Sequence, residues 1–230
     1  MIDASEPLVF IGLISGTSGD GIDAALVQFD VSNTRVIDAK TFAFPPTLAQ
    51  HLAASLAAPH EQTVATTGKL HHDVGLAFAD AANALRDTHS DLHITAVASH
   101  GQTLFHAADA SSPYTLLVGD PAIIAARTGL PVVADFRSAD LAVGGQGAPL
   151  APLFHETVLP HDDETLAVIN LGGIANLSLI RPGEPTIGFD TGPANTLMDV
   201  WAARQWDLPF DANGELAASG TVILGCSHTC

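Results

Sequence analysis

The stretch F-I-G-L-I-S-G-T-S-G-D-G-I-D-A-A-L-V-Q-F-D, residues Phe10–Asp30, decides how the rest of the chain is interpreted. The apolar run Leu8–Ile14 leads into it, the polar, glycine-rich segment Ser15–Gly21 follows, and a second apolar run occupies Ile22–Phe29. Two apolar runs joined by a short glycine-rich turn predict a β-hairpin.

The turn of this hairpin places Gly16, Gly19 and Gly21 between hydroxyl and carboxylate side chains. Glycines allow positive φ angles that direct backbone N–H groups toward one point, and hydroxyls add donors, which is the chemistry of a phosphate-binding turn. An ordinary tight hairpin explains the same composition equally well. The turn contains no lysine and no G-x-x-x-x-G-K-[ST] pattern, so a Walker-type loop is excluded.

Composition limits the class of protein. A chain of 230 residues with 47% hydrophobic residues can form one large domain or two ordinary ones with a substantial core. Eight Lys and Arg against 25 Asp and Glu give a net charge of −17. Such a charge repels nucleic acid and anionic membranes, and we exclude both as partners. A phosphorylated ligand would need Mg²⁺, backbone amides or a few arginines.

The two ends of the sequence carry little chemistry. The first residues are acidic, and their apolar run is too short for a signal peptide or a membrane span. Cys226, His228 and Cys230 stand at the other end, but three crowded ligands do not make the usual four-ligand zinc site. A body without cysteine is typical of a cytoplasmic protein, which is our expectation.

The first half of the chain predicts a series of helices and strands. A strand at Val36–Phe44 precedes two helices, the second with Leu70, Val74 and Phe78 on one face and with His71 and His72 at the surface. A short strand, Ile94–Ala98, then leads into S-H-G-Q-T (Ser99–Thr103). Polar residues at the carboxyl end of such a strand are where open α/β sheets bind ligands.

A further strand and helix lead to the most polar loop of the sequence. Tyr114–Val118 predicts the strand, and Asp120-Pro121 and Gly129 mark the start and end of the helix. The strand Pro131–Ala134 opens onto the loop Asp135–Leu150, which contains two carboxylates, an arginine and three glycines. This loop has the composition of a site, and a helix over Leu150–Val158 closes the unit.

The same order of elements then starts again. Leu166–Leu171, the turn Gly172-Gly173 and Leu177–Ile180 form a second predicted hairpin, followed by the strand Ile187–Phe189 and a helix with Leu197 and Trp201. The sequence therefore predicts a structural repeat. We place the first α/β domain at 1–162, the start of a second α/β domain at 163–220 and an aberrant tail at 221–230. The second domain is expected to be incomplete.

Five motifs carry a resemblance to a known family. They are S-G-T-S-G-D-G-I-D (Ser15–Asp23), S-H-G-Q-T (Ser99–Thr103), V-V-A-D-F-R-S-A-D-L-A-V-G-G-Q-G-A-P-L (Val132–Leu150), N-L-G-G-I-A-N (Asn170–Asn176) and G-F-D-T-G-P-A-N (Gly188–Asn195). Together, over residues 8 to about 220, they resemble the anhydro-N-acetylmuramic acid kinases of the actin-like, sugar-kinase ATPase superfamily. The resemblance implies duplicated ribonuclease H-like α/β domains. It also implies the conversion of 1,6-anhydro-N-acetylmuramic acid, ATP and water into N-acetylmuramic acid 6-phosphate and ADP, a step of peptidoglycan recycling in the bacterial cytoplasm.

The sequence departs from the family pattern at several positions. Ile14 stands where a methionine is usual, Gly19 where a larger residue is usual, and Ala194 where a glycine is usual. Family members continue well beyond Gly220, and the tail from about Val222 resembles nothing in the family. We therefore expect a chain that stops within its second domain.

The resemblance also implies the roles of individual residues. Asp190 is the base that activates water, although a plain helix cap before Pro193 would explain its position equally well. Sugar contacts are expected from His100, Gln102, Arg137 and Asp140, with Arg137 on the lactyl carboxylate of the substrate. The residues expected to hold the phosphates of ATP are Ser15, Gly16, Thr17, Ser18, Gly19, Asp20, Gly172, Gly173 and Asn176. Mg²⁺ is expected near Asp20 or Asp190 through water. The roles of His106, Asp109 and Asp135 stay open, and so does a homodimer.

Two other functions compete with the kinase. A non-catalytic remnant or a sugar-binding module of the same family would carry the same motifs. A hydrolase based on Ser99 and His100 is disfavoured, because adjacent residues of a strand point apart and no G-x-S-x-G motif is present.

Overall fold

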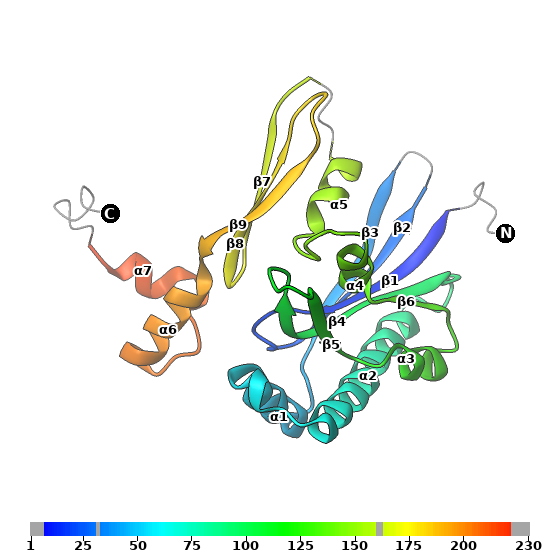
Figure 1. Ribbon diagram of the computed structural model, residues 1–230, viewed down its shortest axis with the longest axis horizontal. Coiled ribbons are helices and arrows are strands. Elements are labelled where there is room, and N and C mark those ends of the chain that lie inside the picture. Colours follow the sequence, from blue (N-terminus) through cyan, green and yellow to red (C-terminus); the bar gives the residue numbers. More distant parts are fainter. Residues whose placement is uncertain (1–6, 31–32, 160–162, 222–230) are drawn as a thin grey trace. The chain divides into compact units, whose positions relative to one another are not determined.

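The computed structural model describes residues 7–30, 33–159 and 163–221 (Figure 1). The chain divides into two compact units, Met1–Leu150 and Ala151–Cys230. The boundary between the two units follows from contacts within the chain and lies between Leu150 and Ala151. It therefore comes at the start of the helix predicted over Leu150–Val158, which we had assigned to the first domain. The domain limits proposed from the sequence, with a boundary between 162 and 163, stay a prediction.

The first unit is built on a six-stranded sheet. Its strands are β1 (Leu8–Ser15), β2 (Ile22–Phe29), β3 (Thr34–Phe42), β4 (Ala96–Ala107), β5 (Tyr114–Val118) and β6 (Val132–Ala134). The order is β3-β2-β1-β4-β5, and β6 also pairs with β4. β2 runs antiparallel to both of its neighbours, β1 and β3, whereas β4 runs parallel to β1 and β6 parallel to β4. The predicted hairpin is confirmed, with Leu8 opposite Phe29 and Ile14 opposite Asp23.

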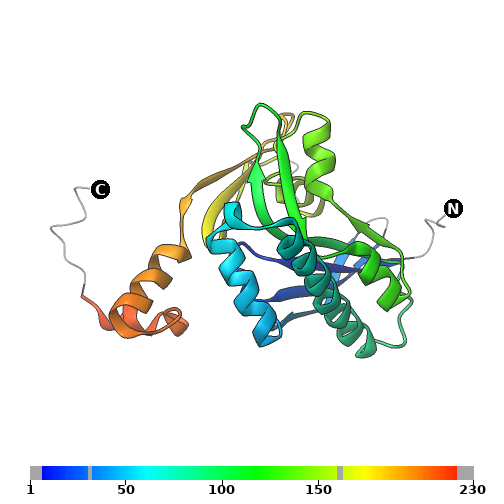
Figure 2. The ribbon, with the colours of Figure 1, turned by 60° about the horizontal axis from the view of Figure 1, so that its bottom comes forward.

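Helices cover one face of this sheet. They are α1 (Pro46–Ala57), α2 (Val64–Asp87) and α3 (Pro121–Thr128), with a short 3₁₀ turn η1 (Pro59–Glu61) between the first two. α2 contacts strands β1 to β5, and Figure 2 shows α1 and α3 on the same side of the sheet. Their boundaries follow local chemistry. The Thr63 side chain caps α2 by accepting from the N–H of Thr66, and the Asp120 carboxylate caps α3 by accepting from the N–H of Ala122.

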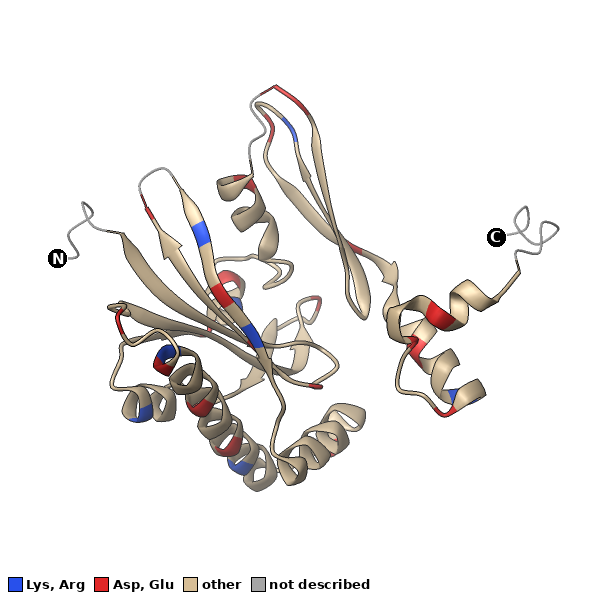
Figure 3. Ribbon diagram, turned by 180° about the vertical axis from the view of Figure 1, so that it is seen from behind, with Lys and Arg blue, Asp and Glu red and all other residues tan. Residues whose placement is uncertain are grey.

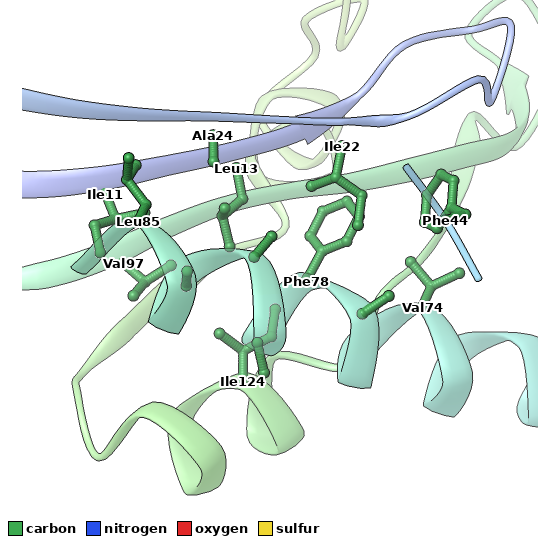
Figure 4. Packing of buried hydrophobic residues seen from close by; sticks show 14 of the residues in the cluster. Ile11, Leu13, Ile22, Ala24, Phe44, Val74, Phe78, Leu85, Val97 and Ile124 are labelled. Carbon is green, nitrogen blue, oxygen red and sulfur yellow. The ribbon is translucent and has the colours of Figure 1, made fainter. Parts of the chain in front are cut away.

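The core lies between the sheet and α2 (Figure 4). Alternate residues of β1, among them Ile11 and Leu13, point toward α2 and meet Val74, Phe78 and Leu85. Burial of each such side chain contributes roughly 1.5–3 kcal/mol, so the apolar stripe of α2 is sufficient to hold the helix on the sheet.

Two predictions for this unit were wrong in detail. β4 does not end before the S-H-G-Q-T motif but runs through it to Ala107. The polar loop after β6 contains a short helix, α4 (Phe136–Ala142). Of the two histidines expected at the surface, His72 is exposed, whereas His71 is partly buried and its Nδ1 accepts the N–H of Gly119 at 3.2 Å.

The second unit has a smaller sheet. Its elements are α5 (Ala151–Val158), β7 (Leu166–Leu171), β8 (Ile174–Ile180), β9 (Ile187–Pro193), α6 (Asn195–Trp206), η2 (Ala212–Gly214) and α7 (Glu215–Ser219). The strands form an antiparallel sheet in the order β7-β8-β9. The order hairpin, third strand, helix thus occurs in both units. The prediction of an α/β chain with two hairpin-led units is confirmed, and the second unit is the smaller of the two.

The second unit leaves many apolar side chains in contact with solvent. Ile169 and Leu171 of β7 are 65% and 64% exposed, and Leu197 and Trp201 of α6 are 63% and 59% exposed. The described part of α6 buries one residue, Ala202. In the first unit, by contrast, the main helix buries a full stripe.

Charged residues follow the composition. Lys and Arg occur as isolated positions among more numerous Asp and Glu (Figure 3). Within the described residues, no helix is long and apolar enough to cross a membrane.

Candidate functional site

The turn between β1 and β2 presents a polar surface. The N–H of Gly19 donates to the carbonyl of Gly16 at 3.0 Å, and Gly19 has a φ of 65°, a conformation that favours glycine. Thr17, Ser18 and Asp20 are exposed around it. Two hydroxyls and one carboxylate are therefore available to a ligand at this turn.

Ser15 does not share this exposure. Its side chain is 3% exposed, and its Oγ has no hydrogen-bond partner among the described residues. In this conformation Ser15 can offer a phosphate only its backbone. Its place among the phosphate-binding residues stays a prediction.

A bulge in β4 directs His100 out of the regular ladder. Leu13 pairs with Ser99 and Ile14 with Gly101, so His100 is an extra residue without a partner in β1. Bulges re-aim side chains next to functional sites. The conformation depends on Gly101, whose φ is 76° and whose missing Cβ would lie 2.7 Å from the carbonyl oxygen of Val118.

His100 and Arg137 form a direct pair. The Nε–H of Arg137 donates to His100 Nε2 at 2.9 Å, and His100 Nδ1 lies 3.1 Å from the carbonyl oxygen of Gly101. Since Nε2 accepts, the ring proton is on Nδ1 and is donated to Gly101. Burial of the ring is the main cause that lowers the pKa of His100; the bond to Gly101 opposes this shift, and the charge of Arg137 adds to it.

Asp140 organises the glycine-rich end of the same segment. Its Oδ2 accepts the N–H of Gly147 at 2.7 Å, and its backbone carbonyl accepts the N–H of Gly145 at 2.9 Å. Asp140 therefore lies on the α4 segment with Arg137 and stabilises the loop. Its role as a sugar contact stays a prediction.

Gln102, the fourth predicted sugar contact, lies elsewhere. It is completely buried, and it pairs with Ser15 across the β1–β4 ladder. Its Nε2 donates to the carbonyl of Thr103, while its Oε1 has no partner among the described residues. The structure thus gathers three of the four predicted contacts, His100, Arg137 and Asp140, and buries the fourth.

A hollow of about 450 Å³ opens beside His100 on the sheet face opposite α2. Small residues line much of it, and His100 and Phe136 stand in its wall. Asp23 and Lys40 also line it, and the Asp23 carboxylate accepts a hydrogen bond from Thr41 Oγ1 at 2.6 Å. The hollow has room for a small molecule next to His100.

The three residues left open can now be placed. Asp135 is exposed at the end of β6 with a φ of 64°, a left-handed conformation that Asp tolerates better than most residues. Asp109 is exposed in the β4–β5 turn. His106 lies next to Gly147, and its Nδ1 is buried without a described partner.

In the second unit, polar residues align across the three strands. Asn170 of β7 pairs with Asn176 of β8, and Asn176 pairs with Asp190 of β9. Residues directly opposite each other share a sheet face, with Cβ atoms about 4.5–5.5 Å apart. Asp190 is exposed on that face. The ladder is irregular just beyond this pair, where Thr191 Oγ1 donates to the carbonyl of Ala175 at 3.1 Å.

The turn Gly172-Gly173 is held by the start of α6. The N–H groups of Ala194 and Asn195 donate to the carbonyls of Gly173 and Gly172, each at 2.9 Å, and Thr196 Oγ1 donates to Gly173. These bonds satisfy the first donors of α6. Asp190 lies within β9 and does not cap the helix, whose N-cap is Ala194, so the capping alternative is wrong.

Sequence reasoning missed one interaction of this unit. The distance between Nδ1 of His155 on α5 and Oγ of Ser178 on β8 is 2.9 Å, a hydrogen bond, and Ser178 is 1% exposed. The pair fixes α5 on the sheet. Neither residue belongs to a recognisable motif.

The remaining alternatives have clear outcomes. Ser99 is 2% exposed with an unpartnered Oγ, and the His100 ring bonds to Gly101 and Arg137, so no Ser99–His100 dyad exists. No cluster of three metal-ligating side chains occurs in the ranges 7–30, 33–159 and 163–221. The exposed Asp20 fits a carboxylate that reaches Mg²⁺ through water. Cys226, His228 and Cys230 lie outside the described residues.

Comparison with known proteins gives a consistent result. The family model described as anhydro-N-acetylmuramic acid kinase matches residues 8–227. The match extends past Val222, so the expectation that the tail from about that residue resembles nothing in the family is wrong as far as residue 227. The anhydro-N-acetylmuramic acid kinase of Xanthomonas oryzae pv. oryzae (strain MAFF 311018) is 46% identical over 227 residues, covering 96% of this chain and 60% of the relative. The protein of that name from Vibrio cholerae serotype O1 is 42% identical over 221 residues, covering 95% and 59%. The chain thus spans about 60% of the length of the curated relatives it matches.

Solved structures are more distant. A Ppx/GppA family member from Aquifex aeolicus is 8% identical with a TM-score of 0.40, over 87% of this chain and 55% of that one. A chain of the PilM–PilN type IV pilus biogenesis complex is 12% identical with a TM-score of 0.40, over 94% and 69%.

Proposed function

Because this chain belongs to the anhydro-N-acetylmuramic acid kinase family, we propose that it phosphorylates 1,6-anhydro-N-acetylmuramic acid with ATP. The observation that carries the proposal is an identity of 41–46% over nearly the whole chain, a length that includes the glycine turns of both units. The products are N-acetylmuramic acid 6-phosphate and ADP. The reaction belongs to peptidoglycan recycling, and its place is the bacterial cytoplasm.

The substrate dictates the chemistry. Its sixth oxygen is bound in an ether bridge to the anomeric carbon, so no free hydroxyl exists at that position. Water attacks the anomeric carbon, the bond from that carbon to the sixth oxygen breaks, and the freed oxygen takes the γ-phosphoryl group from ATP. The reaction needs a base for the water proton and positioned donors for the phosphates.

The first unit supplies donors and a site for the sugar. The exposed turn binds the β- and γ-phosphates through backbone N–H groups and the hydroxyls of Thr17 and Ser18. Mg²⁺, held near Asp20 through water, would shield the phosphate charge from a chain of net charge −17. Arg137, paired with His100, binds the lactyl carboxylate. Asp140 keeps the adjacent loop in place.

The second unit supplies the base. Asp190 is an exposed carboxylate on a strand, and its partner Asn176 lies near the start of β8, just after the turn Gly172-Gly173 that α6 holds. A carboxylate on a strand is fixed more firmly than one on a loop. This placement suits a general base, which must keep its distance to the attacking water within hydrogen-bond reach.

A second candidate function is sugar binding without phosphoryl transfer. It is supported by the contrast between the units: the first has a closed apolar core, whereas β7 and α6 of the second expose Leu171, Leu197 and Trp201. Catalysis by positioning tolerates little looseness, since roughly 1 Å of displacement can cost about 100-fold in rate. If the second unit is loosely held, phosphoryl transfer is lost, whereas the first unit still binds its ligand.

One experiment distinguishes the two functions. The chain is incubated with the anhydro sugar, ATP and Mg²⁺, and products are identified by ³¹P NMR and mass spectrometry, with the Vibrio cholerae relative as positive control. Formation of the 6-phosphate supports the kinase. Binding of the anhydro sugar in calorimetry without product supports the sugar-binding module. If the chain neither binds the sugar nor forms product, both functions are contradicted.

A further inference from the structure

His100 and Arg137 were each expected to contact the sugar, but their geometry gives them different tasks. We propose that His100 is a positioning residue that holds the Arg137 guanidinium for a carboxylate ligand by accepting its Nε–H on a neutral imidazole. This inference rests on the proposed function for the identity of the ligand, the lactyl-bearing anhydro sugar. The pairing itself does not depend on that function.

The hydrogen bonds of the ring fix its proton. Arg137 has no acceptor, so in the 2.9 Å contact with His100 Nε2 the arginine donates and the imidazole nitrogen accepts. The proton must then be on Nδ1, which faces the carbonyl of Gly101 at 3.1 Å. Both ring nitrogens are engaged by the protein, so neither is left for the sugar in this arrangement.

The backbone holds the ring in this orientation. His100 is the extra residue of the β4 bulge, and Gly101 takes the positive φ that follows it. The same residue supplies the carbonyl that accepts the ring proton. The bulge therefore sets both the exit direction of the side chain and its tautomer.

Arg137 gains a fixed plane from this bond. A guanidinium is rigid, so anchoring Nε–H restricts the plane in which its terminal N–H groups lie. Bidentate recognition of a carboxylate depends on that plane. The hollow lined by His100 and Phe136 has room for a small molecule, and Arg137 contacts the His100 ring in its wall.

Protonation of His100 would break the arrangement. A protonated ring has no acceptor nitrogen, and its charge would repel the guanidinium. Of the charged groups, Arg137 on α4 contacts the ring, and Asp23 on β2 and Lys40 on β3 line the same hollow as the ring. Asp140 lies on α4 with Arg137, and its carboxylate accepts the N–H of Gly147. Burial and the charge of Arg137 both keep the ring neutral. Carboxylate binding is therefore expected to weaken in acid.

The first test needs no ligand. Long-range ¹H–¹⁵N spectra of the labelled chain report the tautomer and the titration of each histidine, and the His100→Gln variant assigns the His100 signals. We expect a proton on Nδ1 and a bare Nε2 at neutral pH, and a higher pKa of His100 in Arg137→Leu. A proton on Nε2, or a titration that Arg137→Leu leaves unchanged, would overturn the proposal.

The second test measures binding by calorimetry with two probes, 1,6-anhydro-N-acetylmuramic acid and the same anhydro sugar without its lactyl group. His100→Gln keeps an acceptor near the position of Nε2, whereas the shorter His100→Asn does not reach it. We expect His100→Asn to weaken binding of the lactyl sugar by about 10-fold or more, with His100→Gln within a few-fold of wild type. The probe without the carboxylate should bind all three proteins equally.

Several outcomes decide between explanations. Equal loss for both probes in His100→Asn means that His100 contacts the sugar ring itself, and the proposal fails. If His100→Asn does not fold, as judged by circular dichroism, Arg137→Leu replaces it and must show the same selective loss. If the wild-type chain binds neither probe, the proposed function fails, while the ring spectra still decide whether His100 holds Arg137.

Discussion

Asp190 of β9 lies directly opposite Asn176 of β8, and Asn176 lies opposite Asn170 of β7. Two amides and one carboxylate thus form a row on one face of the small sheet, next to the turn Gly172-Gly173. A neutral amide beside Asp190 leaves this carboxylate without a like charge in the neighbouring strand. The row connects the proposed base with Asn176, which we expect to bind phosphate.

Replacement of Asp190 tests the base. Asp190→Asn keeps the size and the strand but removes the proton acceptor, so ATP-dependent turnover of the anhydro sugar should fall by about 10²–10⁴-fold. The dissociation constant of the sugar should change by no more than a few-fold, because binding does not need the base. Turnover close to wild type would remove Asp190 from the mechanism.

Replacement of Asn176 tests the row. Asn176→Asp places a second carboxylate directly opposite Asp190, and like charges in opposed positions destabilise a sheet by about 0.2–1 kcal/mol. The loss should appear in urea unfolding at pH 7.5 and diminish near pH 3, where carboxylates become protonated. Asn176→Ser, which adds no charge, is the control and should show no such dependence on pH. Equal behaviour of the two variants would contradict the register.

Much of this fold could be predicted from local patterns. The β1–β2 hairpin, the stripe of α2 and the caps of α3 depend on neighbouring residues, and the sequence contains those residues. The bulge at His100 could not be predicted, because it depends on pairing with β1, which is about 85 residues away in the sequence. The burial of Ser15 and Gln102 has the same origin: the ladder places both on the face covered by α2, and polarity alone suggested a surface position.

In the candidate site, too, sequence motifs predicted individual residues but not the contacts that depend on tertiary structure. Arg137 and His100 came from the motifs, but their contact joins α4 to the bulge within β4, which only the tertiary fold brings together. Asp190 was ambiguous because a carboxylate before a helix is typical of a cap. The register of β9 with β8 resolves this, since it extends the strand past Asp190 to Pro193.

The bulge at Gly101 provides a prediction about stability. Gly101 has a left-handed backbone conformation, which alanine adopts only with strain. In Gly101→Ala the added Cβ would also lie 2.7 Å from the Val118 carbonyl oxygen. The conformation costs about 1–2 kcal/mol, and the clash adds to it. Gly129→Ala is a matched control, since Gly129 has a φ of 70° and nothing within 4 Å of the added Cβ. Unfolding in urea should show a clearly larger loss for Gly101→Ala, and equal losses would mean that the strand relaxes around the clash.

His100 also gives the fold a defined pH dependence. Its pKa is lowered in the folded chain, mainly by burial, so just below pH 6.5 the folded ring stays neutral while the unfolded ring binds a proton. The unfolded state then carries more protons, and stability falls as pH decreases from 6.5 toward the lowered pKa. Denaturant titrations between pH 7.5 and 5 should show this slope. His100→Gln, which has no titrating ring, should show a shallower one, and identical slopes would exclude a shifted His100.

The exposed apolar side chains of the second unit lead to the last prediction. Trp201 and Trp206 are the two tryptophans of the chain, both belong to α6, and they are 59% and 50% exposed. Intrinsic fluorescence therefore reports on α6 alone, and we expect red-shifted emission that acrylamide quenches efficiently. Contiguous exposed apolar surface of this kind promotes association. The chain should accordingly bind a hydrophobic dye and self-associate with increasing concentration in sedimentation velocity.

Charge placed on α6 should reverse that association. The double variant Leu197→Glu, Met198→Glu puts two carboxylates where side chains are 63% and 57% exposed, so it should cost little stability and should reduce both dye binding and self-association. Val143→Glu in the first unit is the control, because Val143 is 86% exposed but belongs to the α4 segment, and it should leave both unchanged. If the wild-type chain is monomeric at all concentrations and its tryptophans emit as buried indoles, α6 is covered in solution and its exposure does not drive association.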